Sequence, residues 1–230
     1  MNRRDFICRA AATLGSALLL TSPLGTLLAK ETETEPLAEP KGDGKTDKSN
    51  SKMKIVIITG SPRRNGNSFY LADQFAKGTM EAGHEVFRFD AAFREVKPCM
   101  ACDHCNMDGP CVWKDDFSSV LRPKLLEADL VCICSPMYYF GLSAQIKAVI
   151  DRFYAINYQL HGSKKACFLM TYANTGERDA EPMKVHYEVL LDYMGWKDAG
   201  RVIAPGVWTA GSIKNTRYGQ QAYQLGKNLK

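Results

Sequence analysis

Several signatures that would assign this sequence to a common class of binding protein are missing. The loop after the first predicted strand has neither the Gly-Lys-Ser/Thr ending of a P-loop nor the GxGxxG fingerprint of dinucleotide-binding folds. The net charge of +5 is not gathered into a basic stripe, which argues against a nucleic-acid partner. His84, His161 and His186 are scattered and predict no metal site. These absences argue against a P-loop, a dinucleotide-binding fingerprint, a nucleic-acid partner and a histidine-based metal site.

The first 29 residues read as an export signal. A basic start, MNRRDFICR, precedes residues 10–29, which are mildly apolar and carry no charge. The adjacent Arg3 and Arg4, followed by DFI, resemble the twin-arginine class, which moves folded proteins across a membrane. Leu27 stands where a cleavage site after Ala29 favours a small residue, so an uncleaved membrane anchor is the alternative. We predict an exported, periplasmic or extracytoplasmic protein that uses the twin-arginine translocation machinery.

The rest of the chain divides into a linker and one domain. Residues 30–52 mix charges of both signs with Pro, Gly and Ser and contain no aromatic side chain, which predicts a disordered linker. Residues 53–230 suffice for one domain with a single core. We predict strands at 54–59, 84–90, 129–134, 166–171 and 201–204, and helices at 68–82, 117–127, 142–154, 181–194 and 218–229. Strands that are apolar throughout and separated by helices predict a three-layer, doubly wound α/β fold with a parallel sheet.

The loop TGSPRRNGNS, residues 59–68, has the composition of a phosphate site. Arg63 and Arg64 supply positive charge, and Ser61, Asn67 and Ser68 supply hydroxyl and amide donors. Its two glycines allow backbone N–H groups to face an anion at the start of the following helix. The alternative is an ordinary strand-to-helix loop in which Asn67 or Ser68 caps the helix.

Two later loops supply groups that suit a planar ring. In SPMYYFG, residues 135–141, three aromatic side chains lie where a core does not require them, so a ring system could stack there. The alternative is that one or two of these rings simply cover the end of the sheet. The loop 171–176 offers Thr171, Asn174 and backbone amides to a polar ring edge. Ligands of doubly wound sheets bind beyond the carboxyl ends of the strands, where all three loops lie.

GSPRRNGNS, then PCxxCxxC with a downstream Cys and DDF, then SPMYYFGLSAQIKAVIDRF resemble the NAD(P)H-dependent FMN reductases and iron–sulfur flavoproteins of the flavodoxin-like fold. The resemblance covers residues 53 to about 207 and implies a five-stranded parallel sheet, FMN and a homodimer or larger oligomer. It implies phosphate contacts from Ser61, Arg63, Asn67 and Ser68, ring contacts from Pro136, Met137, Tyr138, Tyr139, Phe140 and Gly141, and Thr171 and Asn174 near the polar ring edge. No catalytic side chain is implied, because the redox chemistry belongs to the cofactor.

Four of the eight cysteines form the pattern CxxCxxCx5C within the predicted cysteine-rich loop 98–116; they are Cys99, Cys102, Cys105 and Cys111. Thiolates at this spacing can wrap a compact inorganic cluster, and the resemblance implies [4Fe–4S]. Zinc suits the pattern less well, because structural zinc usually takes two separated CxxC knuckles. Disulfides in an oxidising compartment and cysteines without metal remain alternatives. The cysteines of the predicted strands behave as small hydrophobes.

The export signal and the cysteine loop fit one function. Cofactors are inserted in the cytoplasm, so a protein that carries them must cross the membrane folded. We predict an FMN-dependent oxidoreductase or electron-transfer iron–sulfur flavoprotein that passes electrons to a small-molecule acceptor. Its donor is a redox protein or a quinol, or else NAD(P)H. The alternatives are a cluster-free NAD(P)H-dependent FMN or quinone reductase and a non-enzymatic flavodoxin-like electron carrier.

Overall fold

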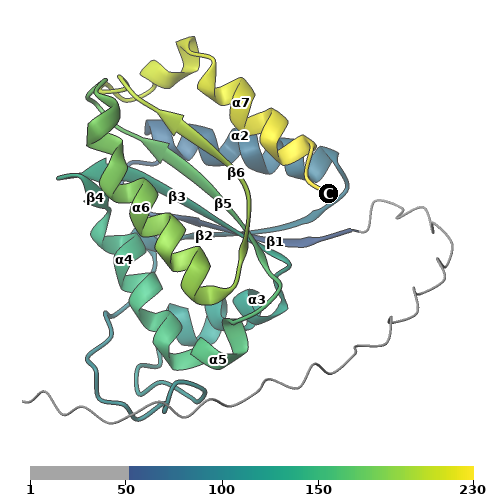
Figure 1. The fold of residues 1–230 in the computed structure, drawn as a ribbon, viewed down its shortest axis with the longest axis vertical. Helices are drawn as coiled ribbons and strands as arrows, with labels where there is room; N and C mark the ends of the chain where they lie inside the picture. Colours follow the sequence, from purple (N-terminus) through teal and green to yellow (C-terminus); the bar gives the residue numbers. More distant parts are fainter. Residues whose placement is uncertain (1–51) are drawn as a thin grey trace, which may run out of the picture. The chain divides into compact units, whose positions relative to one another are not determined.

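The computed structural model describes residues 52–230, so the predicted signal and nearly all of the linker lie outside the described residues. Five parallel strands form the main sheet in the order β2–β1–β3–β5–β6 (Figure 1). They are β1 (Lys54–Thr59), β2 (Glu85–Asp90), β3 (Leu130–Tyr138), β5 (Lys165–Thr171) and β6 (Lys197–Ala204). The short β4 (Gly141–Leu142) turns back and pairs antiparallel with the end of β3. The predicted five-stranded flavodoxin-like sheet is confirmed, and β4 is an addition that the sequence did not predict.

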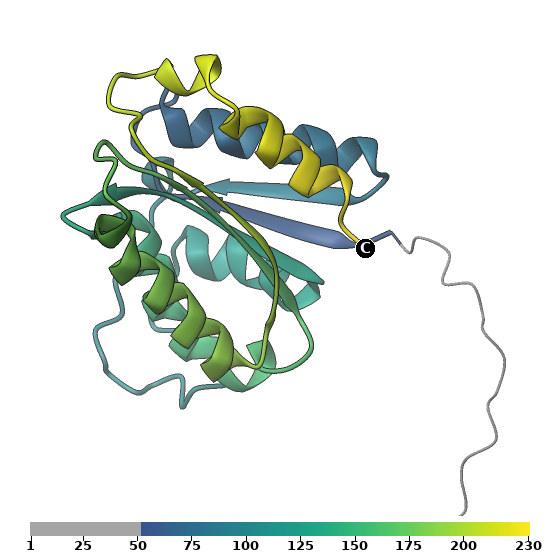
Figure 2. The same ribbon diagram turned by 45° about the horizontal axis from the view of Figure 1, so that its top comes forward.

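Helices cover both faces of the sheet (Figure 2). One face carries α2 (Asn67–Glu81) and α7 (Tyr218–Lys227), and the other carries α3 (Arg122–Glu127), α4 (Ala144–Asp151), α5 (Asn157–Leu160) and α6 (Glu177–Met194). Short turns are η1 (Ala91–Phe93), the π-helix η2 (Phe117–Leu121), η3 (Arg152–Ile156) and η4 (Ser212–Asn215). Among residues 52–230, no helix has the length and apolar character needed to cross a bilayer.

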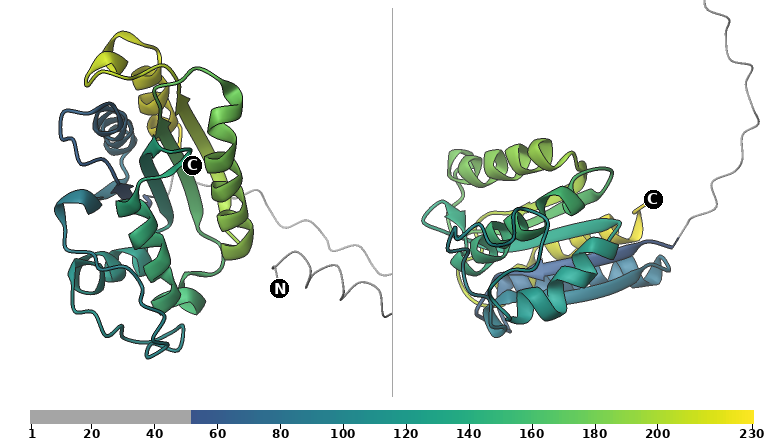
Figure 3. Two further views of the ribbon diagram at one scale, coloured as in Figure 1. Left: turned by 90° about the vertical axis from the view of Figure 1, so that its left-hand side faces the viewer. Right: turned by 90° about the horizontal axis from the view of Figure 1, so that it is seen from below.

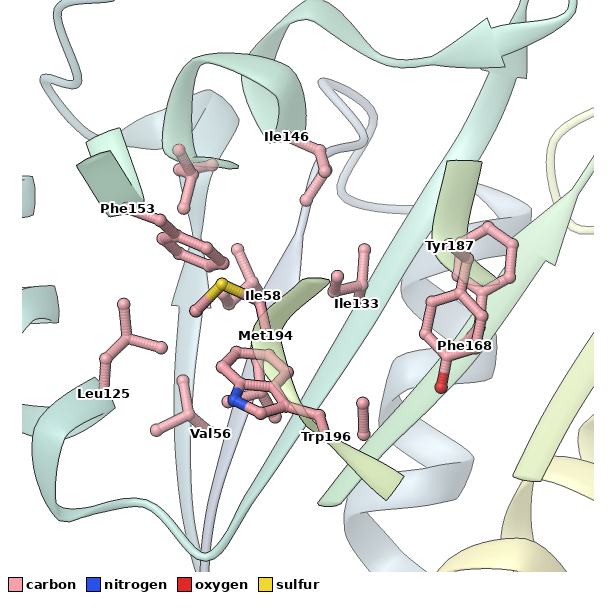
Figure 4. Packing of buried hydrophobic residues seen from close by; sticks show 14 of the residues in the cluster. Val56, Ile58, Leu125, Ile133, Ile146, Phe153, Phe168, Tyr187, Met194 and Trp196 are labelled. Atoms are coloured by element: carbon pink, nitrogen blue, oxygen red, sulfur yellow. The ribbon is translucent and has the colours of Figure 1, made fainter. Parts of the chain in front are cut away.

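Alternate residues of each strand face two separate apolar clusters, which explains why the strands are apolar throughout. Val56 and Ile58 of β1 pack with the α3–α6 side, where Trp196 and Phe153 also lie (Figure 4). The intervening residues of β1 face α2 and α7. The strand cysteines Cys132, Cys134 and Cys167 belong to this second cluster and are fully buried. Burial raises the pKa of the Cys134 thiol to about 12, so these thiols pack as neutral small hydrophobes.

The helices α2 and α7 approach so closely that their backbones nearly touch. A Cβ atom on Gly78 of α2 would lie 2.1 Å from the carbonyl oxygen of Tyr223 in α7. A Cβ atom on Gly226 of α7 would lie 2.3 Å from the carbonyl oxygen of Phe75 in α2. The Tyr223 hydroxyl also donates to the Glu81 carboxylate. Glycine is therefore required on both sides of this contact, which joins segments about 140 residues apart.

Three predicted elements begin or end four residues away from their predicted bounds. Strand β3 runs four residues further than predicted, to Tyr138, because β4 supplies a pairing partner beyond the sheet. Helix α6 begins at Glu177, ahead of Pro182, which the helix accommodates near its first turns. Strand β6 begins at Lys197, where its polar residues pair with β5 through an irregularity next to Gly200. For the two strands, pairing with a neighbouring strand overrides the local sequence pattern.

Candidate functional site

A cavity of about 400 Å³ lies at the carboxyl edge of the sheet, where loops after β1, β3, β5 and β6 meet. Eight of the predicted contact residues line it: Ser61, Arg63, Asn67, Ser68, Pro136, Met137, Tyr138 and Thr171. Four predicted contacts do not line it: Tyr139, Phe140, Gly141 and Asn174. The structure therefore brings together the phosphate loop, the base of the aromatic turn and the start of the third loop, as the sequence predicts.

The start of α2 faces this cavity without a side-chain cap. Gly66 occupies the N-cap position, and no side chain bonds the first-turn N–H groups, so neither Asn67 nor Ser68 acts as a cap. The Ser61 hydroxyl accepts from the Arg63 N–H at 3.2 Å, and the Ser68 hydroxyl pairs with the Thr171 hydroxyl at 2.7 Å. Uncapped N–H groups and the helix dipole favour an anion at this point.

The side chain of Asn67 is used within the fold. Its Nδ2 group donates to the carbonyl oxygens of Val207 and Thr209, both at 3.0 Å, and its Oδ1 atom accepts from the Ile213 N–H at 3.3 Å. The amide therefore fastens the loop after β6 to the start of α2. Only the backbone N–H of Asn67 is left to face an anion.

The aromatic turn lies partly outside the cavity. Tyr139 and Phe140 have φ angles of +46° and +64°, so the backbone is left-handed at the tip between β3 and β4. Tyr139 is 100% exposed, while Tyr138 lines the cavity. Asn174 points elsewhere, because its Nδ2 group donates to Asp179 at 2.9 Å.

Gly60 joins the phosphate loop to the start of α4. A Cβ atom on Gly60 would lie 2.2 Å from Ser143 Oγ and 2.3 Å from Ile146 Cγ1. Ser143 is the N-cap of α4, and its N–H donates to the Ser135 hydroxyl at 3.0 Å. The end of β1, the end of β3 and the start of α4 are thus held as one rigid unit under the cavity.

A larger cavity of about 620 Å³ lies between the start of β6 and α7 and contains none of the predicted residues. It is lined by Lys165, Lys197, Asp198, Ala199, Gln221, Gln224, Leu225, Asn228, Leu229 and Lys230. This cavity lies at the strand starts, whereas ligands of open parallel sheets bind at the strand ends. The smaller cavity at the carboxyl edge is therefore the candidate site.

The cysteine segment forms an irregular loop on the α4–α5 side of the domain (Figure 3). Cys99, Cys102, Cys105 and Cys111 all line one small cavity of about 10 Å³, together with Tyr154 and others. Cys105 is buried, whereas Cys99 and Cys102 are exposed, and all seven described cysteines are free thiols. Within residues 52–230, no three His, Cys, Asp or Glu side chains converge closely enough to hold a metal ion.

Four non-glycine residues of this loop have left-handed backbone conformations, with φ between +46° and +61°; they are Ala101, Asp103, Asn106 and Met107. Asp and Asn adopt this conformation readily, but Ala and Met do so at a cost of roughly 1 kcal/mol or more. Such strain is retained when the surrounding contacts enforce it. Here the loop is fixed at its base and also by the Tyr154 hydroxyl, which donates to the Asp103 carboxylate at 2.6 Å.

A buried ion pair fixes the base of the loop. The fully buried Arg152 donates to both carboxylate oxygens of Asp115, at 2.7 and 3.2 Å, and to the Lys97 carbonyl at 2.8 Å. Asp115 also accepts from the Lys97 N–H at 2.9 Å. Burial opposes ionisation of Asp115, but the hydrogen bonds from Arg152 and the Lys97 N–H outweigh it and hold its pKa below the usual range. The two ends of the loop are therefore joined independently of the cysteines.

A family model for NADPH-dependent FMN reductases matches residues 53–200, which includes the cysteine segment and most of the cavity. The chain belongs to the NADPH-dependent FMN reductase family. This reductase is therefore an FMN-dependent oxidoreductase, as the sequence predicts.

Curated relatives of this reductase include iron–sulfur flavoproteins. One from Methanocaldococcus jannaschii is 31% identical over 144 residues, which cover 62% of this chain and 74% of the relative. One from Archaeoglobus fulgidus is 37% identical over 100 residues, which cover 44% of this chain and 45% of the relative. The chain thus spans only about half the length of the second relative. The resemblance to iron–sulfur flavoproteins is confirmed.

Solved structures confirm the fold of the reductase. The NAD(P)H:quinone oxidoreductase from Methanothermobacter marburgensis superposes with a TM-score of 0.63 at 20% identity, covering 77% of this chain and 96% of that one. An archaeal flavodoxin superposes with a TM-score of 0.50 at 13% identity, covering 76% and 95%. At such identities the likeness concerns the fold alone.

The residues of the carboxyl-edge cavity suit FMN in their chemistry. Arg63 is exposed at the cavity and forms no ion pair within the described part of the chain, so its charge is available to a phosphate. The uncapped start of α2 adds backbone donors. Met137 and Tyr138 supply apolar surface at the end of β3, and Thr171 with its neighbours lines the cavity at the end of the adjacent β5. A phosphate end and an apolar end therefore lie in one cavity.

Sequence reasoning missed the loop after β6, whose residues Val207, Trp208, Thr209 and Ala210 form the remaining wall of the cavity. A signal was present, because VWTA follows a predicted strand and is flanked by Gly206 and Gly211. An aromatic residue in such a loop indicates a place where a planar ring could stack, as the aromatic residues of the SPMYYFG turn do. The role of Arg152 was also missed, since its charge reads as part of a helix surface.

We expect Asp115→Asn to make the stability of the reductase less dependent on pH. The depressed pKa of Asp115 stabilises the fold at neutral pH, and this contribution is lost as the pH falls below the usual carboxyl range of about 4. Removing one partner of a buried pair costs about 3 kcal/mol. Urea unfolding at pH 7 should give the variant a free energy of unfolding that is lower by about this amount. At pH 3 the difference in free energy of unfolding between the variant and the unmodified protein should be smaller.

Asp116→Asn is the matched control for this measurement. Asp116 accepts only the Glu95 N–H, at 2.9 Å, in a more exposed position. We expect its substitution to cost less than about 1 kcal/mol. Equal losses for both variants, or a gap that does not change with pH, would show that the Arg152–Asp115 pair does not fix the loop.

Proposed function

We propose that this reductase is an exported iron–sulfur flavoprotein that receives electrons from a redox protein or a quinol and passes them to a small-molecule acceptor. The observation that supports it most is the meeting of the phosphate loop, the aromatic turn and the Thr171 loop in one cavity at the strand ends. In this proposal the FMN phosphate binds at the start of α2 and at Arg63. The isoalloxazine ring would lie against Pro136, Met137 and Tyr138, with Thr171 at its polar edge.

We further propose that Cys99, Cys102, Cys105 and Cys111 ligate a [4Fe–4S] cluster. Their number and type fit such a cluster, and all four line the same cavity. That cavity of about 10 Å³ has room for no more than a water molecule, so the segment must open to take a cluster. The described residues contain no group of three His, Cys, Asp or Glu side chains close enough to hold a metal ion, so the proposal rests on the number and type of the cysteines and on the cavity that they share. The base fixed by Arg152 stays in place while the tip opens.

FMN supplies transfer of one or two electrons, and a [4Fe–4S] cluster supplies transfer of one. The protein's own residues bind and orient these groups. Arg63 and the α2 N–H groups hold the phosphate, Tyr138 and Met137 support the ring, and the cysteine segment provides a second redox site on a separate surface. The two cavities share no lining residue, so each can be altered without removing the other.

A cluster-free NAD(P)H-dependent FMN or quinone reductase is the second candidate. The small volume between the cysteines and the exposure of Cys99 and Cys102 favour it. Anaerobic purification followed by analysis of iron, sulfide and FMN per chain separates the two. About four irons per chain supports the first proposal, and FMN without iron supports the second. A non-enzymatic flavodoxin-like carrier would bind FMN but fail to turn over quinones with any donor.

For export, we expect Arg3→Lys combined with Arg4→Lys to keep the protein in the cytoplasm. The change preserves the charge but removes the paired guanidinium groups of the predicted twin-arginine signal. Fractionation of cells that express the full chain measures the result, with Arg9→Lys as a control outside the pair. Normal export of the double variant would contradict the twin-arginine proposal and make loading before export unnecessary.

Size-exclusion chromatography with light scattering tests the proposed homo-oligomer.

A further inference from the structure

The loop after β6 places a tryptophan on the wall of the FMN cavity. Residues 205–211 join β6 to η4, and Trp208 lines the cavity although its side chain is 78% exposed. Exposing a large aromatic side chain has no packing benefit, and an exposed ring on a cavity wall suits a ligand.

The position of Trp208 along the cavity is set by Asn67. The two carbonyl groups that flank Trp208, those of Val207 and Thr209, both accept from the Nδ2 group of Asn67 at 3.0 Å. Asn67 is the first residue of α2, where the uncapped N–H groups lie. The backbone of Trp208 is therefore held beside the proposed phosphate subsite and not beside the aromatic turn.

Further contacts make the loop a fixed support. Gly206 and Gly211 bracket it with φ angles of +72° and +83°, which other residues adopt with difficulty. The Gly206 N–H donates to the Asn174 carbonyl at 2.9 Å, and the Val207 N–H donates to the Tyr172 carbonyl at 3.0 Å. The backbone at Trp208 is therefore ordered before a ligand binds, which lowers the entropy cost of binding.

The indole N–H of Trp208 is also available. The other two tryptophans use theirs within the fold: Trp113 donates to the Pro98 carbonyl at 3.2 Å and Trp196 donates to the Leu160 carbonyl at 2.8 Å. Among residues 52–230, Trp208 makes no such bond. Buried indole N–H groups usually find a partner, so a ligand that covers this ring should supply an acceptor.

We propose that Trp208 is an FMN-contact residue: its ring covers the ribityl-phosphate end of bound FMN, and its Nε1–H donates to the phosphate. This assignment rests on the proposed phosphate position at the start of α2. Covering that end excludes water from the charged contacts of Arg63 and the helix N–H groups, which strengthens them. Trp208 thereby makes the site prefer FMN to riboflavin, which lacks the phosphate.

The direct test follows the three indole N–H resonances of the full-length, flavin-free protein, labelled with ¹⁵N on tryptophan. Trp→Phe variants assign the resonances. We expect FMN to shift the Trp208 resonance and to slow its exchange with water, while riboflavin leaves it near its free position. The Trp113 and Trp196 resonances serve as internal controls because their N–H groups are already bonded. A Trp208 resonance that ignores bound FMN, or that responds equally to riboflavin, would overturn the proposal.

Affinity provides the second readout. Trp208→Ala should weaken FMN about tenfold and riboflavin less than twofold. Trp208→Phe, which keeps a ring but loses the N–H, should fall between the alanine variant and the unmodified protein. Trp113→Phe is the matched control and should leave both affinities unchanged. Trp208 is exposed, so its substitution should not disturb folding, and circular dichroism checks this.

The outcomes separate this inference from the proposed function. If the unmodified protein fails to bind FMN at all, the proposed phosphate position is wrong as well. If it binds FMN but Trp208→Ala has no effect on the ratio of FMN to riboflavin affinity, only the assignment of Trp208 is wrong. The exposed ring would then serve a different contact, such as a second copy of the chain, and loss of oligomer in Trp208→Ala would show this.

Discussion

Replacing Arg63 with alanine will weaken FMN by about ten- to a hundredfold while changing riboflavin affinity by less than about threefold. Arg63 lines the cavity beside the uncapped start of α2 and has no carboxylate partner in the described part of the chain. A hydrogen bond to a charged group contributes about 1.5–3 kcal/mol, and each 1.4 kcal/mol changes an equilibrium constant tenfold. Titration of the flavin-free protein with each ligand, followed by flavin fluorescence, measures both affinities.

Arg64→Ala is the matched control for this prediction. Arg64 is the adjacent residue and has the same charge, but its guanidinium stacks on the Phe93 ring, 3.8 Å from the ring centre, and does not line the cavity. Long-range attraction of the phosphate would be lost equally in the two variants and would weaken at high salt. A specific bond is lost only in Arg63→Ala. Equal weakening of FMN and riboflavin by Arg63→Ala would show that Arg63 does not contact the phosphate.

Replacing Cys105 with serine will remove most of the iron from anaerobically purified protein and abolish its reduction by a low-potential one-electron donor. Cys105 is the buried member of the four cysteines, so its loss removes the innermost proposed ligand. FMN content should stay near one per chain, because the flavin cavity shares no residue with the cysteine segment. Iron and flavin analysis and the bleaching of the yellow flavin colour under the donor provide the measurements.

Cys167→Ala controls for the general loss of a thiol. Cys167 is buried in β5, away from the cysteine segment, and its removal should leave the iron content unchanged. Any oxidation of NAD(P)H by the Cys105→Ser variant should persist, since that reaction needs only the flavin site. Unchanged reduction of Cys105→Ser by the one-electron donor, or iron-free unmodified protein, would replace the proposal with the cluster-free reductase.

The strand and helix order could be predicted because both faces of the sheet are covered. A short apolar run such as KIVIIT, rich in β-branched residues and ended by Gly60, favours a buried strand, and the segments between such runs have helical spacing. The position of the loop 59–68 at the cavity could be predicted for the same reason, since the loop directly follows β1, while its binding of a phosphate stays a prediction. Local sequence thus contains the information for features that depend on neighbouring residues.

Features that depend on distant residues could not be predicted. Asn67 reads as a phosphate donor in sequence, but its side chain is taken by carbonyl groups about 140 residues away. Trp208 lines the cavity because the hydrogen bonds from Asn67 hold its loop at the start of α2. In the sequence, Arg152 looks like a charge on a helix surface. In the structure it is buried and donates to Asp115, which lies 37 residues earlier in the chain. In each case the partner is decided by tertiary packing, which a single-sequence pattern does not show.

The close packing of α2 against α7 has a consequence for biosynthesis. Helix α2 is made early on the ribosome, but the face that it presents around Gly78 is covered only after residues 218–227 have been made. The loop that Asn67 holds is also made late. Contacts of such long sequence separation form slowly and leave apolar surface exposed meanwhile. The cavity at the carboxyl edge is therefore complete only after the loop 205–211 has been made, so the proposed loading with FMN follows the synthesis of that loop.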